Sequence, residues 1–211
     1  AGNVNDTYLT TVEGGRHKHF LLQRINQQVF HQPKLIAENL RVFTNHVQQR
    51  LAQESTKSEH GRGWETPSIL STLGRQDFVE DDSGEFWRAI TVVENASTHL
   101  SIRDAAHAGE AGYALGRFHS LVSDLDPARL HDTLVGFHIT PQYLAAFDAI
   151  YDRLLAGKTN TGKTAVHLTD PDVAFGIDFV ARNRHRAHLL EDAKAQGILT
   201  ERTIHGDPKV D

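Results

Sequence analysis

Cysteine and methionine are both absent from this chain of 211 residues. Without cysteine, disulfides and thiolate metal sites are excluded, and a cytoplasmic protein is our default expectation. Because a translation product begins with methionine, Ala1 is either a processed end or an internal start, and the motifs below favour an internal start. Long apolar runs are also missing: stretches such as residues 90–93 fall far short of the ~20 residues that a membrane span needs.

A basic surface is missing as well. The chain has 22 Lys and Arg residues against 27 Asp and Glu residues, which gives a net charge of −5. The positive residues are scattered and form no stripe that would follow a phosphate backbone. We therefore expect neither nucleic acid nor a membrane as partner. Hydrophobic residues make up 39% of the chain, which is typical of a soluble globular protein with a core.

Strand patterns predominate in the first part of the chain. β-branched and aromatic residues predict strands at 6–12 and 18–25, joined by a turn at Gly14 and Gly15. Further strands are predicted at 68–72, 77–80 and 85–94. Between these two groups Pro33 opens a long amphipathic helix, because apolar residues recur at helical spacing at positions 36, 40, 43, 47 and 51.

Helix patterns predominate from Arg103 onward. A stripe of apolar and small residues at positions 108, 111, 115, 118 and 122 predicts one helix, and further helices are expected at 141–155 and 171–195. A brief strand is expected at 201–204. A β-rich part followed by an α-rich part predicts an α+β fold of two lobes, with residues 1–96 in the first lobe and 97–211 in the second.

Residues 157–164 (Gly-Lys-Thr-Asn-Thr-Gly-Lys-Thr) match the Walker A pattern of phosphate-binding loops to the letter. Such a loop needs a buried strand before it and a helix after it. Here the preceding segment is amphipathic at helical spacing, and residues 165–171 do not start like a helix. We therefore favour a polar loop between helices, and a P-loop NTPase remains the alternative.

The end of the chain carries the residues for a second kind of phosphate chemistry. Phosphoryl transfer to a hydroxyl needs a carboxylate that orients the hydroxyl or takes its proton, and cations that neutralise the transferred group. Asp207, flanked by His205 and followed by Lys209, supplies the carboxylate and part of the positive charge. A surface turn is the alternative, since Gly206, Asp207 and Pro208 are ordinary turn residues.

These motifs, taken in order, resemble the aminoglycoside-phosphotransferase and choline-kinase superfamily, and within it the N-acetylhexosamine 1-kinase-like proteins. The resemblance covers essentially the whole segment. It is carried by Gly2-Asn3-x-Asn5-x-Thr7-Tyr8, Leu22-Gln23-x-x-Asn26 with Phe30, Asn39, Trp87-Arg88, Glu110-Ala-Gly-x-Ala-x-Gly116, Phe137-His138 before Thr140-Pro141, and His205-x-Asp207-x-Lys209.

The resemblance implies a two-lobed protein-kinase-like fold, truncated at both ends, that uses ATP and Mg²⁺. It implies transfer of the γ-phosphoryl group to a hydroxyl of a small molecule, a sugar or amino sugar. Asp207 matches the catalytic aspartate, and Lys209 matches a lysine that touches the γ-phosphate. The metal-binding Asn and a second metal-binding carboxylate would follow Asp211, so we expect no metal ligand within the chain.

The same resemblance implies the residues of the nucleotide side. The turn that would cover the ATP phosphates contains Gly2, Asn3, Asn5 and Thr7. Arg24 matches the cation that meets the phosphates, and Glu38 is a candidate partner for it from the first helix. Glu94 stands where the strand enters the interlobe hinge, whose backbone groups would contact adenine. A solvated surface arginine is the alternative for Arg24.

One further interpretation stays open. A non-catalytic binding module that keeps the kinase fold is the second alternative to the phosphotransferase, because a fold does not guarantee activity.

The 14 histidines include close pairs at positions 17 and 19 and at 185 and 188. No H-E-x-x-H spacing accompanies them, so we assign no histidine metal site.

Overall fold

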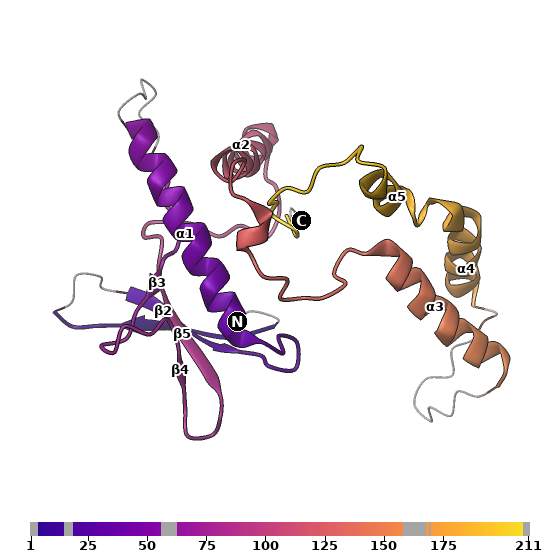
Figure 1. Ribbon diagram of the computed structural model, residues 1–211, viewed down its shortest axis with the longest axis horizontal. Coiled ribbons are helices and arrows are strands. Elements are labelled where there is room, and N and C mark those ends of the chain that lie inside the picture. The colour runs from indigo at the N-terminus through magenta and orange to yellow at the C-terminus, as the bar shows by residue number, and fades with distance from the viewer. Residues whose placement is uncertain (1–3, 15–18, 56–62, 158–167, 169, 209–211) are drawn as a thin grey trace. The chain divides into compact units, whose positions relative to one another are not determined.

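A computed structural model describes residues 4–14, 19–55, 63–157, 168 and 170–208. In this part of the chain the fold is α+β, with one antiparallel sheet and several helices (Figure 1). None of the helices in the described residues is both long and apolar enough to cross a membrane. The elements are β1 (Asp6–Thr11), β2 (His19–Ile25), α1 (Pro33–Ser55), β3 (Ile69–Leu70), β4 (Val79–Glu80), β5 (Phe86–Thr91), α2 (Ala105–Leu121), η1 (Pro127–Arg129), α3 (Thr140–Leu155), α4 (Pro171–Asn183), η2 (Arg184–Arg186) and α5 (Leu189–Ala195).

The sheet has the strand order β1-β2-β5-β3, and β4 pairs with β5. β1 and β2 form the predicted hairpin, from Asp6 opposite Arg24 to Thr11 opposite His19. β2 then pairs with β5, which places Gln23 opposite Arg88 and Arg24 opposite Trp87. The turn before β5 is built by Asp81, whose carboxylate accepts hydrogen bonds from the backbone of Ser83 and Glu85. The five strands predicted in the first part of the chain and the predicted hairpin are therefore confirmed.

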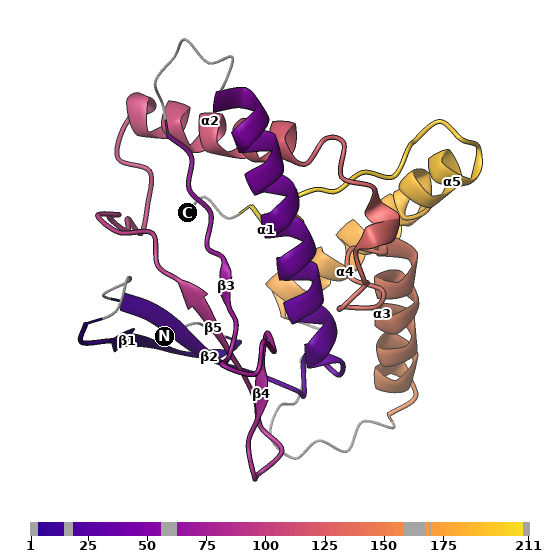
Figure 2. The same ribbon diagram turned by 60° about the vertical axis from the view of Figure 1, so that its left-hand side comes forward.

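Helix α1 covers one face of this sheet (Figure 2). Ala37 of α1 packs in one buried cluster with Ile69 of β3 and Ile90 of β5, and Leu21 of β2 borders the cluster. Because side chains alternate across a strand, positions 21, 23 and 25 of β2 and positions 86, 88 and 90 of β5 share this face. We call it the helix face, and the face that carries positions 20, 22, 24, 87, 89 and 91 the outer face.

A second buried cluster joins α1 to α2. Val47 of α1 packs against Leu121, Val122 and Leu125 at the end of α2, and all four are almost fully buried. The predicted apolar stripes of both helices thus meet each other. Ion pairs surround the cluster: Arg117 of α2 pairs with Glu54 of α1, and Arg50 of α1 lies 2.7 Å from Asp124.

The chain divides into two compact units, residues 1–134 with 202–211, and residues 135–201. The second unit contains α3, α4, η2 and α5. The stretch predicted to be helical over 171–195 is helical, but the 3₁₀ turn at Arg184–Arg186 divides it into α4 and α5. Arg184 there bonds both carboxylate oxygens of Asp148 on α3, at 2.7 and 2.6 Å. The lobe boundary at residues 96 and 97 stays a prediction.

The strand expected at 201–204 is not formed. Those residues have no regular secondary structure and pair with no strand of the described sheet. Their side chains make separate contacts instead: the Thr203 hydroxyl donates to the carbonyl of Leu125 at 3.2 Å, and Glu201 pairs with Lys194. This segment is thus held by single side-chain contacts rather than by a strand ladder.

Candidate functional site

The segment that leads to Asp207 is held against α2. The backbone N–H of His205 lies 3.3 Å from His119 Nε2, and the His205 ring meets the edge of Phe118 with ring centres 5.3 Å apart. Asp207 follows two residues later and is exposed. Lys209 lies outside the described residues. The structure therefore positions the backbone just before Asp207 and leaves its carboxylate in solvent.

The first residues of the predicted phosphate-covering turn, Gly2 and Asn3, also lie outside the described residues. Asn5 and Thr7 are described, and both side chains are bonded to β2 or to the residue that follows it. The Asn5 side-chain carbonyl accepts the backbone N–H of Asn26 at 3.0 Å, and the Thr7 hydroxyl accepts from Gln23 Nε2 at 3.2 Å. These bonds tie the start of β1 to the end of β2.

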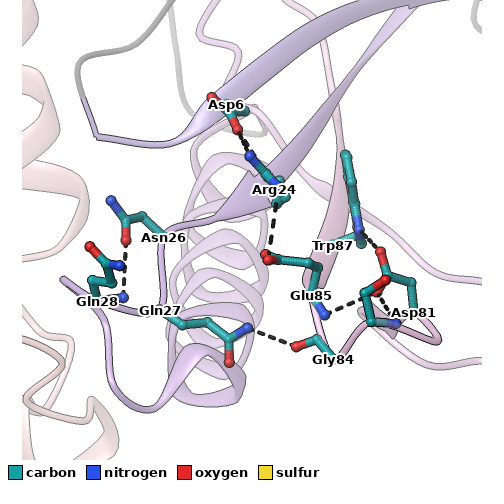
Figure 3. Close-up of polar contacts among 10 residues, drawn as sticks. Asp6, Arg24, Asn26, Gln27, Gln28, Asp81, Gly84, Glu85 and Trp87 are labelled. Carbon is teal, nitrogen blue, oxygen red and sulfur yellow. Dashed lines mark hydrogen bonds and ion pairs between the residues drawn. The ribbon is translucent and has the colours of Figure 1, made fainter.

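Arg24 lies on the outer face, between two carboxylates (Figure 3). Its Nε donates to Asp6 at 2.9 Å, a second nitrogen also bonds Asp6, and Glu85 lies 3.8 Å away. The hydrogen bond and charge of Asp6 raise the pKa of Arg24 above its usual value, and Glu85 adds to this. The prediction that Glu38 pairs with Arg24 is wrong, because Glu38 pairs with His131 at 3.0 Å instead.

A cavity of about 390 Å³ opens beside Arg24. Its lining includes Asp6, Arg24, Glu85 and the loop 26–28. Two hydrogen bonds hold the loop: Gln27 Nε2 donates to the carbonyl of Gly84 at 2.8 Å, and the Gln28 N–H donates to the Asn26 side chain at 3.0 Å (Figure 3). With two carboxylates and one guanidinium, these three ionised side chains carry a net charge of −1, so the positive charge of Arg24 is already neutralised.

The helix face carries a second polar group, which reasoning from the sequence did not predict as a group, although Thr7 was expected at the ATP phosphates and Gln23 and Arg88 belong to the motifs of the resemblance. Thr7, Gln23 and Arg88 occupy adjacent register positions across β1, β2 and β5. Arg88 Nε donates to the Gln23 side-chain carbonyl at 3.0 Å, and the Gln23 amide donates to Thr7. Burial lowers the pKa of Arg88. The signal in the sequence was an arginine between Phe86 and Ile90, at positions that alternate toward a buried face.

Glu94, the residue predicted at the interlobe hinge, is exposed in a turn after β5, and Asn95 next to it has a positive φ of 57°.

The segment before the Walker A match is helix α3, as its spacing predicted, and it runs into Gly157 without a strand. Residues 158–164 lie outside the described residues. The strand that a P-loop needs before it is therefore replaced by a helix.

Within the described residues, no group of three or more His, Cys, Asp or Glu side chains comes together where a metal ion could bind. No protein-family model matches the chain.

Proposed function

We propose that the protein belongs to a two-lobed kinase-like fold and transfers the γ-phosphoryl group of ATP to a hydroxyl of a small molecule, a sugar or amino sugar. The observation that supports this most is the anchoring of the segment before Asp207. A carboxylate that orients a reacting hydroxyl needs a positioned backbone and an accessible side chain. The contacts of His205 with Phe118 and His119 supply the first, and the exposure of Asp207 supplies the second.

In this mechanism Asp207 hydrogen-bonds the acceptor hydroxyl and takes its proton as the phosphoryl group arrives. The nucleotide phosphates lie against the sheet, with donors from β1 and β2 and a cation from the strands. Mg²⁺ would reduce the charge of the nucleotide. The assignment of Asn5 and Thr7 to the phosphates and of Glu94 to the hinge stays a prediction. The assignment of Arg24 to the phosphates stays a prediction from the resemblance alone, and the proposed mechanism does not use it, because Asp6 and Glu85 already pair its charge.

The test replaces Asp207 with Asn in the intact protein. The change keeps the size of the side chain and removes its charge and basicity, so turnover should fall by about 10²- to 10⁴-fold. ATP affinity should be retained, because the lost interaction acts chiefly in the transition state. Turnover is measured by phosphate transfer to a panel of sugars and amino sugars, and ATP affinity by calorimetry.

The matched control is Asp82→Asn, an exposed aspartate in the turn before β5. It removes the same charge from the surface and should leave turnover unchanged. Normal turnover in Asp207→Asn would contradict the mechanism. A wild-type protein that binds ATP but transfers phosphate to no acceptor would instead favour the non-catalytic binding module.

A further inference from the structure

Arg88 differs from the other partly buried arginines of the described residues. Arg24, Arg41, Arg50 and Arg117 each pair with a carboxylate. Arg88 has no carboxylate partner among the described residues, and its side-chain hydrogen bond there is the neutral contact with Gln23. Burial alone shifts its pKa, without a contribution from any neighbouring charge. The charge of Arg88 is therefore uncompensated in the part of the chain that the structure describes.

An uncompensated, partly buried cation is costly to a folded protein. Removing a charge from water lowers stability unless a counter-charge or hydrogen bonds replace the lost hydration. Phe86 and Ile90, two residues away on either side on the same face, are both buried, so the stem of Arg88 lies among apolar groups. A buried charged residue that lowers the stability of the folded state in this way is a candidate for binding a ligand of opposite charge.

The hydrogen-bonding groups around Arg88 are arranged to donate. Gln23 holds Nε, which leaves the two terminal nitrogens of the guanidinium. Among the described residues, Trp64 Nε1 is the buried polar side-chain atom without a hydrogen-bond partner. The terminal nitrogens of Arg88 do not belong to this class, so they are not fully buried and reach solvent. Thr7 accepts from Gln23 and keeps its own O–H for donation. The guanidinium edge of Arg88, linked through Gln23 to the Thr7 hydroxyl, provides donors that match the oxygens of a phosphate group.

We propose that Arg88, oriented by Gln23 and assisted by Thr7, is a phosphate-binding residue on the helix face of the sheet. That the phosphate is carried by a nucleotide rests on the proposed function; the affinity for phosphate itself does not. Arg24 on the outer face serves as the matched control, because it is a strand arginine one register position away whose charge is already paired.

The experiment titrates the full chain with inorganic phosphate and with ATP, at an ionic strength held constant with NaCl. Arg88→Gln should weaken both ligands by about 10- to 100-fold, as expected for losing a charge-assisted contact of this kind. Arg24→Gln should change either affinity by less than about threefold. The folded state of Arg88→Gln is checked by thermal unfolding, and it should be no less stable than wild type, because no ion pair is lost.

A second measurement uses the wild-type protein and does not depend on the folding of a variant. The ¹H–¹⁵N resonance of Arg88 Nε should shift as phosphate or ATP is added, while that of Arg24 should not. Arg88→Lys assigns the resonance by removing it.

The outcomes separate this inference from the proposed function. If phosphate shifts the Arg88 resonance but no nucleotide binds, the phosphate site stands and the kinase assignment fails. If ATP binds wild type and Arg88→Gln equally, the phosphate site is wrong and the kinase assignment survives. A shift at Arg24 instead of Arg88 would overturn the inference in favour of the outer face. If neither ligand binds the wild-type protein, both proposals are wrong.

Discussion

The two faces of the sheet place an arginine in opposite surroundings. Arg24 and Arg88 lie on neighbouring strands, one register position apart, yet the pleat sends their side chains to different faces. On the outer face Arg24 is exposed to water and bonded to Asp6 and Glu85. On the helix face Arg88 lies between Phe86 and Ile90, with a neutral amide as its partner.

This difference separates a positive charge that is paired with carboxylates from one that, among the described residues, is not. An exposed ion pair such as that of Arg24 with Asp6 contributes little to stability, typically below about 1 kcal/mol, and leaves little positive charge to attract an anion. A partly buried charge without a counter-charge lowers stability, so its presence calls for a ligand or a functional reason. The comparison therefore favours the helix face as the place where a phosphate binds.

The largest expected effect tests whether the helix face is the structural core of the sheet. Phe86 is 2% exposed and stacks on Phe78 with ring centres 4.5 Å apart. Phe86→Ala should destabilise the protein by about 3–5 kcal/mol in denaturant unfolding, through lost burial and the cavity left behind. Val79→Ala is the control on the other face, because Val79 is 49% exposed and pairs with Trp87; it should cost less than about 1 kcal/mol. Equal losses would contradict the distinction between the faces.

A smaller effect concerns the ion pair that joins α1 to the sheet edge. Arg41 Nε donates to Asp77 at 2.9 Å, and this bond, aided by Ser71, lowers the pKa of Asp77 against the opposing effect of burial. A carboxylate with a lowered pKa in the folded state adds stability that is full above its unfolded pKa of about 3.9 and is lost as pH falls through the folded pKa. Asp77→Asn should therefore cost about 1 kcal/mol near neutral pH and progressively less below about pH 4.

The measurement for Asp77→Asn is urea unfolding at a series of pH values, with Asp82→Asn as the exposed control. Asp82→Asn should follow the wild-type profile within about 0.5 kcal/mol. A stability difference between wild type and Asp77→Asn that does not change with pH would show that the carboxylate charge of Asp77 contributes nothing. The link between α1 and the sheet edge would then rest on packing alone.

Local periodicity explains why most elements could be predicted. The alternation at 6–12 and 18–25 and the helical spacing from Pro33 are properties of neighbouring residues, and β1, β2 and α1 form where they indicate. The division of the helical stretch at 171–195 into two helices was not predicted, and it coincides with a contact distant in sequence. Arg184 at the break pairs with Asp148, 36 residues earlier, and no local pattern reveals that partner.

The site was harder to predict, because it depends on which strands pair and in which register. Gln23 and Arg88 are 65 residues apart and meet only because β2 pairs with β5. Arg24 was selected from a resemblance in the strand sequence, which contains no information on the face that its side chain takes. The pairing of Arg24 with Glu38 failed for this reason: Glu38 lies on α1, whereas Arg24 occupies the outer face.

The smallest expected effect tests whether either face of the sheet is the nucleotide site. A working P-loop at residues 157–164 would bind the phosphates with its own residues and make the comparison of Arg24 with Arg88 irrelevant to function. Helix α3 leads into that segment in place of the strand that a P-loop needs. Lys163→Ala in the intact protein should thus leave ATP affinity and turnover within about threefold of wild type, measured in the assay used for Asp207→Asn. A loss of about a hundredfold or more, as expected for removing a transition-state contact, would assign the nucleotide to the P-loop instead.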